Sequence, residues 1–148
     1  MKEKFVNYYM QVAELTSKLS YAKRLQVGAV VVKGHKILAT GYNGMPSGWD
    51  NNCEEWVKVT DIFSDADKEL KTRQEVLHAE SNAITKLATS TESSENSTMF
   101  CTHAPCIQCA KLIYQSGIKT LYYKHTYRDT AGLEFLKKSG VEIVQYNI

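Results

Sequence analysis

The sequence lacks an excess of charge of either sign. Its 148 residues include 18 lysines and arginines against 16 acidic residues, a net charge of +2. A chain that binds nucleic acid by neutralising phosphates usually has a strongly basic balance. Polyanion binding is therefore not indicated, although a small anionic ligand needs only a few local cations. Long hydrophobic runs are also missing, because the longest uncharged apolar stretch, Val27 to Val32, is far too short to cross a bilayer.

The first ten residues, MKEKFVNYYM, lack the architecture of a secretory signal peptide. We therefore expect a cytoplasmic protein that makes no membrane contact. The chain has only four cysteines: Cys53, Cys101, Cys106 and Cys109. In a reducing compartment these are metal ligands, catalytic thiols or small core residues more often than disulfide partners, and their spacing has to decide between these roles.

Apolar periodicity and turn-forming residues predict the order of elements along the chain. The expected segments are a helix over 5–19, a hairpin of strands 27–32 and 37–39, a structured loop over 41–52, a helix-compatible stretch over 54–77, a helix over 78–87, a solvated loop over 89–98, a strand over 99–102, a helix over 106–115, a strand over 119–123, a helix over 130–138 and a strand over 141–144. This alternation predicts an α/β fold, with residues 1–148 forming one three-layer α/β/α domain. Its five-stranded mixed sheet has an antiparallel first pair.

The pair Cys106 and Cys109 stands in P-C-I-Q-C at the start of a predicted helix. C-x2-C at a helix start brings both sulfurs near one point. Pro105 suits the first turn, and the positive end of the helix dipole favours thiolate over thiol. Taken alone, such a pair is more often a structural zinc site or a redox pair than part of a catalytic site.

A zinc ion held by these thiolates needs a further ligand, and the chain offers His35, His78, His103 and His125. His78 opens H-A-E at a predicted helix start. Residues two apart on a helix do not share a face, so we expect Glu80 beside the metal rather than on it. Three protein ligands leave a fourth position for water, as in catalytic zinc sites, and a neighbouring carboxylate can move the water's proton. His103 is the main competitor of His78 because it is close to the thiolates in sequence.

H-x-E followed by P-C-x-x-C is the signature of zinc-dependent nucleobase deaminases. The sequence carries HAE and APCIQCAK together with QVGAVVV, GYNGMPSG, SGIKTLYY and YRD at Tyr127. On these segments it resembles the deoxycytidylate (dCMP) deaminases, from about Val27 to Val144, and GYNGMPSG is the segment that points to this branch. The resemblance implies the cytidine deaminase-like fold and the hydrolysis of dCMP to dUMP and ammonia, which supplies dUMP for thymidylate synthesis.

The resemblance also implies roles for individual residues. The zinc ligands would be His78, Cys106 and Cys109. Glu80 would take a proton from water and pass protons to ring nitrogen N3 and to the leaving amine. The sugar 3′-hydroxyl would meet Asn43, and the pyrimidine would be held by the backbone of Ala79 and the carbonyl of Ala104.

The 5′-phosphate of such a substrate needs donors at the cavity mouth. The candidates are Lys23, Arg24, Arg128 and the hydroxyl of Tyr127, of which Arg24 and Tyr127 are favoured. Arg24 is equally explained as a solvated cation after a helix.

Regulation and assembly also follow from the resemblance. It implies a homo-hexamer that is activated by dCTP and inhibited by dTTP with Mg²⁺, with Tyr42, Asn43 and Gly44 in the effector site. The resemblance therefore does not decide whether Asn43 belongs to the substrate site or to the effector site.

The other two cysteines have simpler interpretations. Cys101 lies in an apolar strand and is read as a buried core thiol. Cys53 matches a position that joins histidines in a second zinc site of some viral relatives. Because no histidine occurs between Ala39 and Leu77, we expect an ordinary thiol and one zinc per chain.

Two other functions remain open from the sequence. A cytosine or adenine deaminase acting on single-stranded nucleic acid would share the zinc ligands and Glu80, but the charge balance argues against it. A non-catalytic nucleotide-binding module, in which zinc only staples the fold, would have no use for Glu80.

Overall fold

The computed structural model describes residues 1–59 and 68–147. The helices are α1 (Glu3–Ser17), α2 (Ala79–Ala88), α3 (Ile107–Gln115) and α4 (Ala131–Lys138). The strands are β1 (Gly28–Lys33), β2 (Lys36–Tyr42), β3 (Glu54–Lys58), β4 (Lys68–Thr72), β5 (Thr98–His103), β6 (Thr120–His125) and β7 (Glu142–Gln145). Most of the expected elements are present, with ends shifted by one or two residues and with a longer second strand.

Five of the strands form one mixed sheet in the order β2-β1-β5-β6-β7. Strand β1 pairs antiparallel with β2 and with β5, whereas β5, β6 and β7 are parallel. The β1–β2 turn places Gly34 and His35 at φ of 55° and 62°. Two left-handed residues in a tight turn match the twist of the flanking strands. The predicted five-stranded mixed sheet is confirmed.

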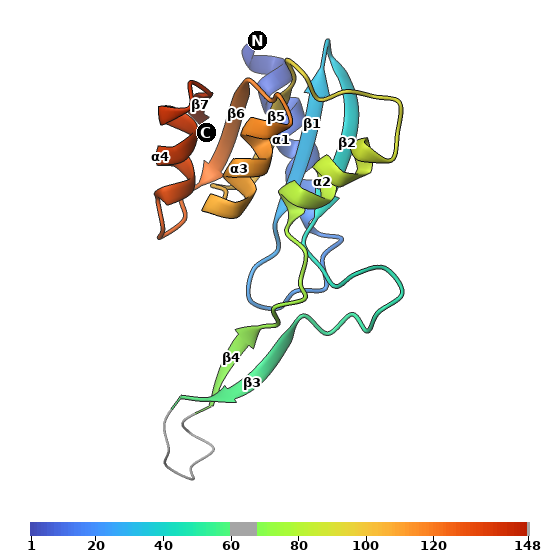
Figure 1. Cartoon of the computed structure of the whole chain (residues 1–148), viewed down its shortest axis with the longest axis vertical. Coiled ribbons are helices and arrows are strands. Elements are labelled where there is room, and N and C mark those ends of the chain that lie inside the picture. Colours follow the sequence, from blue (N-terminus) through green and yellow to red (C-terminus); the bar gives the residue numbers. More distant parts are fainter. Residues whose placement is uncertain (60–67, 148) are drawn as a thin grey trace.

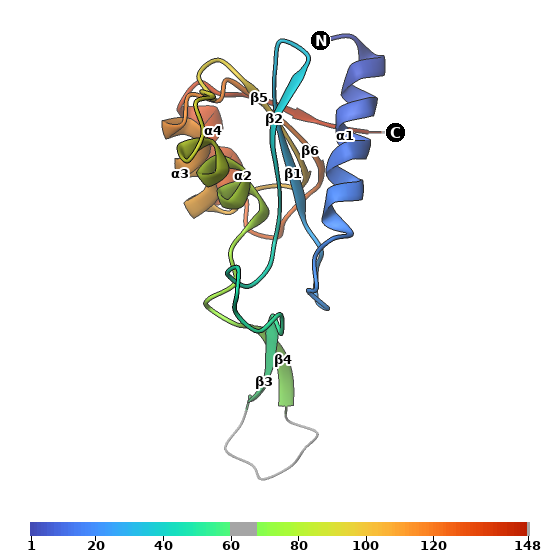
Figure 2. The ribbon, with the colours of Figure 1, turned by 90° about the vertical axis from the view of Figure 1, so that its right-hand side faces the viewer.

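Helix α1 covers one face of this sheet, and α2, α3 and α4 cover the other (Figures 1 and 2). The sequence of β1 explains how both faces are filled. Val30 and Val32 pack with Met10 of α1, while Ala29 and Val31 belong to the core cluster under the other three helices. Successive strand residues point to opposite faces, so a continuous apolar run lets one strand serve two cores. The three-layer α/β/α architecture is thus the one predicted.

The stretch 54–77 corrects the sequence interpretation. Its described part is not helical: β3 and β4 pair antiparallel in a separate two-stranded sheet, with Trp56 opposite Leu70. The few apolar residues of this charged stretch do not separate helix from strand in the sequence, and the cross-strand pair of Trp56 with Leu70 is a contact that only the hairpin makes. Residues 60–67 of the expected helical stretch lie outside the described residues. The hairpin extends away from the main sheet (Figures 1 and 2).

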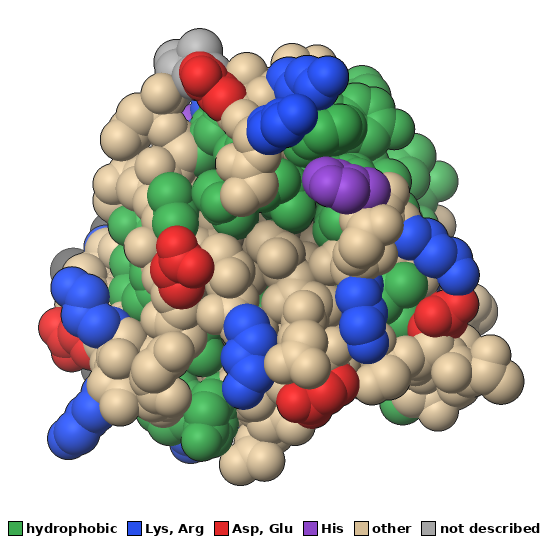
Figure 3. Space-filling model, turned by 90° about the horizontal axis from the view of Figure 1, so that it is seen from above, with side chains coloured by type: hydrophobic (Ala, Val, Ile, Leu, Met, Phe, Trp, Pro, Cys, Tyr) green, Lys and Arg blue, Asp and Glu red, His purple; other side chains and the backbone are tan. Residues whose placement is uncertain are grey.

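The end of the molecule opposite this hairpin has a mixed surface. Lysine and arginine side chains alternate there with acidic and hydrophobic groups (Figure 3). Among the described residues, no helix combines the length and the apolar character needed to span a membrane.

Candidate active site

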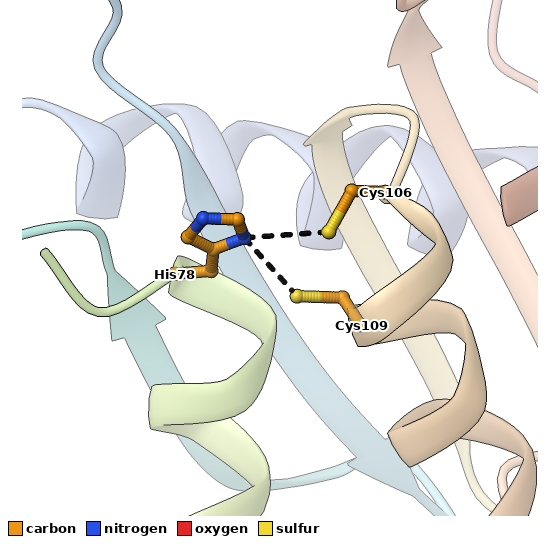
Figure 4. Close-up of side chains that lie close together, drawn as sticks. All are labelled: His78, Cys106 and Cys109. Atoms are coloured by element: carbon orange, nitrogen blue, oxygen red, sulfur yellow. Dashed lines mark hydrogen bonds between the residues drawn. The ribbon is translucent and has the colours of Figure 1, made fainter. Parts of the chain in front are cut away.

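Two helix starts bring three metal-binding side chains together. His78 is the N-cap of α2 and Cys106 is the N-cap of α3, with Cys109 in the first turns of α3. The three side chains point toward one another (Figure 4). Nδ1 of His78 lies 3.5 Å from Sγ of Cys106 and 3.4 Å from Sγ of Cys109. We call these three residues the His-Cys-Cys cluster.

The cluster has the chemistry and the spacing of a zinc site. Bonds of about 2.3 Å to sulfur and about 2.0–2.1 Å to nitrogen in a tetrahedral site place the ligand atoms roughly 3.5 Å apart. The three ligand atoms here lie within 4.8 Å of one another. One imidazole and two thiolates form a donor set that zinc prefers. In residues 1–59 and 68–147, the group close enough to share one ion contains neither His103 nor Cys101.

Two close backbone approaches set the positions of these ligands. A Cβ at Gly41 of β2 would lie 2.2 Å from the carbonyl oxygen of Ala79, and one at Gly132 of α4 would lie 2.1 Å from the carbonyl oxygen of Pro105. Only glycine fits at such approaches. Strand β2 therefore packs directly on the first turn of α2, and α4 packs on the loop that carries Cys106.

The protons of the cluster are distributed unevenly. The pKa of Cys106 is far below the usual range because its sulfur accepts hydrogen bonds from Cys109 and from His78. The hydrogen bond with Cys106 raises the pKa of His78. The pKa of Cys109 is raised because its thiol donates to Cys106 and because it is buried. A lowered pKa favours the thiolate form of Cys106, which is the form that binds a metal ion.

Glu80 is buried beside the cluster, in the first turn of α2, with 5% of its surface exposed. Burial is the main cause of its raised pKa. A raised pKa makes the carboxylate a stronger base, which suits a group that has to take a proton from water. Burial, with the nearby charge of Glu80, also raises the pKa of Cys101. Cys101 is fully buried in β5, which agrees with its interpretation as a core thiol.

A cavity of about 160 Å³ opens at the cluster. The structure brings most of the sequence-predicted residues to it: Asn43, His78, Ala79, Glu80, Ala104, Cys106 and Tyr127. Arg24 is not one of the described lining residues, but its Nη1 donates to Oγ1 of Thr72, which is one, at 3.2 Å. The lining residues that sequence reasoning missed are Ala22, Leu25, Val27, Glu54, Thr72 and Val76; His103, which the sequence offered as a competing zinc ligand, also lines the cavity.

Asn43 holds one wall of this cavity in place. Its Oδ1 accepts the N–H of Val27 at 2.8 Å, and its Nδ2 donates to the carbonyl of Leu25 at 2.8 Å. Its own carbonyl accepts the hydroxyl of Ser20. The amide keeps one N–H that these contacts do not use. Asn43 is therefore a turn-fixing residue whose side chain also faces the cavity.

His103 forms another part of the wall. Its Nδ1 lies 2.9 Å from Oγ1 of Thr102, and that oxygen also accepts the N–H of Gly28. Because a hydroxyl oxygen can accept two hydrogen bonds and donate one, either Thr102 or Nδ1 of His103 is the donor, according to the tautomer of the ring. Burial and the nearby His125 lower the pKa of His103. His103 therefore presents a neutral ring to the cavity.

Glu54, at the start of β3, is a buried carboxylate that the sequence analysis does not single out. Only 4% of its surface is exposed. Its Oε1 accepts the backbone N–H groups of Lys23 and Arg24 at 2.8 and 3.2 Å. In a stretch as charged as 54–77, a glutamate looks like a solvated side chain. In the structure, its carboxylate instead accepts hydrogen bonds from the backbone of a chain segment about 30 residues upstream.

A second cavity, of about 410 Å³, lies at the end of β2 and the loop that follows it. Tyr42 and Gly44 line it, together with Cys53 and Lys86. The described lining of this second cavity does not include Asn43, which lines the first one. The two neighbours of Asn43 thus face one cavity while Asn43 faces the other.

Comparisons with known proteins agree with this geometry. Residues 3–125 match the model of the cytidine and deoxycytidylate deaminase zinc-binding region. The chain is similar to the crystal structure of dCMP deaminase from cyanophage S-TIM5 in complex with dCMP and dUMP, with 44% identity, a TM-score of 0.87 and 99% of each chain covered. It is 36% identical to the deoxycytidylate deaminase of phage T4, covering 90% of this chain and 86% of that protein.

A longer relative is the deoxycytidylate deaminase of Schizosaccharomyces pombe, which is 36% identical over 95% of this chain. The chain spans 43% of the length of that relative. The region shared with it contains both helix starts that form the His-Cys-Cys cluster. On the family match and on these identities, the chain belongs to the cytidine and deoxycytidylate deaminase family of zinc-binding enzymes.

Proposed function

We propose that this deaminase converts dCMP to dUMP and ammonia and so supplies dUMP for thymidylate synthesis. The observation that carries the proposal is the buried Glu80 in the same cavity as the His-Cys-Cys cluster. The cyanophage structure supports the substrate, because that protein is 44% identical and was solved with dCMP and dUMP. We take residues 1–148 as one catalytic domain.

His78, Cys106 and Cys109 would hold one zinc ion. When bound, zinc lowers the pKa of water toward about 7 and makes it a nucleophile at neutral pH. The ion together with two thiolates and one neutral imidazole would have a formal net charge of zero. Such a site is a weaker Lewis acid, so a neighbouring base has to help deprotonate the water. Glu80 supplies that base: it accepts a proton from water and donates one to ring nitrogen N3, which makes C4 electrophilic. The hydroxide that is left from the water forms a bond to C4, Glu80 moves the remaining hydroxyl proton to the amine, and ammonia leaves as the C4 carbonyl of dUMP forms.

The pyrimidine lies between the backbone of Ala79 and the carbonyl of Ala104 in this proposal. The N–H of Ala104 donates to the carbonyl of His125 at 2.8 Å, which fixes the β5–α3 loop against β6. The carbonyl of Ala104 accepts from the exocyclic amine. The unused amide proton of Asn43 is available to the sugar oxygen.

The 5′-phosphate is assigned to the outer end of the cavity. Tyr127 lines the cavity with 39% of its surface exposed, and its hydroxyl is assigned as a phosphate donor in this proposal. Arg24 lies next to it through Thr72. A guanidinium and a phenol together give the charged and neutral donors that a phosphate requires.

Regulation is assigned to the second cavity. We propose that dCTP with Mg²⁺ activates the enzyme there and that dTTP with Mg²⁺ inhibits it, with Tyr42 and Gly44 as effector contacts. Asn43, whose backbone joins those two residues, links this cavity to the substrate cavity. We further propose a homo-hexamer, which light scattering with and without dCTP tests directly.

The enzyme is proposed to act on the cytoplasmic nucleotide pool, because thiolate ligands persist in a reducing compartment.

The test follows ultraviolet absorbance of dCMP with zinc-loaded protein, with and without dCTP and Mg²⁺, against deoxycytidine as control substrate. We expect dCMP to be converted and deoxycytidine to react much more slowly. Glu80→Gln should lower kcat by about 10²- to 10⁴-fold and keep one zinc per chain. Glu69→Gln, at an exposed position on β4, is the matched control and should behave as wild type.

Two results would contradict the proposal. Zinc-loaded protein that converts neither compound but deaminates a single-stranded oligonucleotide would identify a polynucleotide substrate. A Glu80→Gln protein that converts dCMP at the wild-type rate would show that Glu80 takes no part in the reaction.

A further inference from the structure

His103 has an unused ring nitrogen at the cavity of the His-Cys-Cys cluster. The residue lines that cavity from the end of β5. Its Nδ1 is engaged with Oγ1 of Thr102 at 2.9 Å. Within the part of the chain that the structure describes, Nε2 has no hydrogen-bond partner, and it is not one of the buried atoms that lack a partner. This nitrogen therefore remains accessible to a ligand, and the proposed reaction gives it no role.

Neighbours on two sides hold the ring of His103 in place. The residue is paired with His125 in the register of β5 and β6, and the two ring centroids are 4.9 Å apart. On the other side, Thr102 is itself buried, and its Oγ1 also accepts the N–H of Gly28 at 3.1 Å. A side chain that is locked by packing and hydrogen bonds positions its polar atom accurately. Nε2 of His103 is thus a preorganised group in the wall of the cavity.

The order of the strands determines which edge of the pyrimidine His103 meets. Glu80 lies in α2, which packs against β1 and β2, whereas His103 lies at the end of β5, on the other side of β1 from β2. In the proposed reaction Glu80 donates to N3, and the carbonyl of Ala104 accepts from the amine on C4. N3 and C5 flank C4 on opposite sides of the ring. With N3 toward Glu80, C5 points toward the strand that carries His103.

Resting on the proposed function, we propose that His103 is a specificity-determining residue that favours deoxycytidylates with a small polar substituent on C5, such as a hydroxymethyl group. Nε2 donates to the substituent when it carries the ring proton, and it accepts from the substituent when Nδ1 carries that proton. A hydroxyl serves in both cases, whereas a hydrocarbon substituent serves in neither. The reaction is otherwise the same: 5-hydroxymethyl-dCMP and water give 5-hydroxymethyl-dUMP and ammonia.

The test compares 5-hydroxymethyl-dCMP with 5-ethyl-dCMP, because the two substituents are similar in size and differ in polarity. The ratio of their kcat/KM values is measured in wild type, His103→Leu and His103→Gln. The ratio in wild type should exceed that in His103→Leu by about 2- to 12-fold, the range for one hydrogen bond between neutral groups. His103→Gln keeps a donor and an acceptor at the end of the side chain and should retain most of the wild-type ratio. His35→Asn, in the β1–β2 turn at a positive φ that asparagine tolerates, is the distant control and should match wild type.

Conversion of dCMP is measured in parallel, so that the proposed function and the inference are tested separately. If wild type does not convert dCMP, the proposed function fails and the inference fails with it. If wild type converts dCMP but neither 5-substituted nucleotide, the inference alone is wrong. It is also wrong if the ratio is equal in wild type and His103→Leu, or if His103→Gln falls to the ratio of His103→Leu. If His103→Leu has no turnover, calorimetry with 5-hydroxymethyl-dUMP and 5-ethyl-dUMP measures the ratio from binding, and an equal ratio in both proteins would overturn the inference.

Discussion

The two ends of the cavity at the His-Cys-Cys cluster are built differently. At the inner end, His78, Glu80 and Cys106 lie at the starts of helices that rest on the main sheet. At the outer end, the wall comes from the connection between α1 and β1, from the base of the β3–β4 hairpin at Glu54, and from the loop of Tyr127. The inner end thus belongs to the packed layers, and the outer end to connecting segments.

The forces that fix these ends also differ. Backbone packs directly on backbone at Gly41 and Gly132, so the inner end has no freedom to adjust without moving a helix. Side chains hold the outer end, through bonds from Asn43 and Glu54 to backbone groups 16 to 31 residues away. Rigid elements position reacting groups more accurately than loops, whereas loops adapt to ligands. Substitutions at the inner end should therefore affect chemistry, and those at the outer end should affect binding.

The largest effect is expected when one ligand of the cluster is removed. Cys106→Ser should lose bound zinc and lower kcat by at least roughly 10³-fold, because metal assistance amounts to several kcal/mol of the barrier. Metal content per chain and kcat are measured together. Cys53→Ser is the matched control and should keep one zinc per chain. A Cys106→Ser protein that retains both zinc and activity would contradict the assignment of the cluster.

A smaller effect is expected from tightening the packing behind the cluster. In Gly41→Ala the new methyl would meet Ala79 O at 2.2 Å and Ala83 N at 2.6 Å, so α2 has to shift. We expect a loss of about 1–3 kcal/mol in the free energy of unfolding, as for overpacking elsewhere. A displacement near 1 Å of Glu80 lowers kcat by up to about 10²-fold. Thermal unfolding and kcat measure the two effects.

Gly44→Ala controls for the loss of a glycine in the same segment, because no described atom lies within 4 Å of a Cβ at Gly44. Its unfolding temperature and zinc content should match wild type. Equal destabilisation in both variants would mean that the close approach at Gly41 is not the cause of the stability loss.

The inner end could be predicted from sequence because its determinants are local. HAE and PCIQC each place their residues at a helix start, and both starts meet in the structure. The outer end could not be predicted in the same way. The partner of Glu54 is a turn 30 residues upstream, and the hairpin has too few apolar residues to separate strand from helix. Asn43 was predicted as a sugar contact, but its hydrogen bonds to the 25–27 backbone needed coordinates.

At the outer end, Asn43→Ala should act mainly on binding. It leaves the N–H of Val27 and the carbonyl of Leu25 without their side-chain partners. Unsatisfied groups of this kind cost about 1–3 kcal/mol, part of which appears as a higher KM when the wall loosens. Steady-state kinetics with dCMP separates KM from kcat. Asn52→Ala, at an exposed position, is the control, and a fall in kcat as large as that of Glu80→Gln would contradict this division of roles.

The smallest effect is expected on the hairpin that projects from the body. Trp56 is 66% exposed, and its cross-strand partner is Leu70. A cross-strand aromatic pair contributes about 0.2–1 kcal/mol, and exposed substitutions usually stay within about 0.5 kcal/mol. Trp56→Ser should therefore change the free energy of unfolding by no more than about 0.5 kcal/mol and leave kcat unchanged, as denaturant titration and the dCMP assay would show. A clearly larger loss, accompanied by a smaller mass in light scattering, would mean that another copy of the chain covers Trp56. The hairpin would then be an assembly surface as well as a wall of the cavity, and the contrast between the two ends would hold only for the isolated chain.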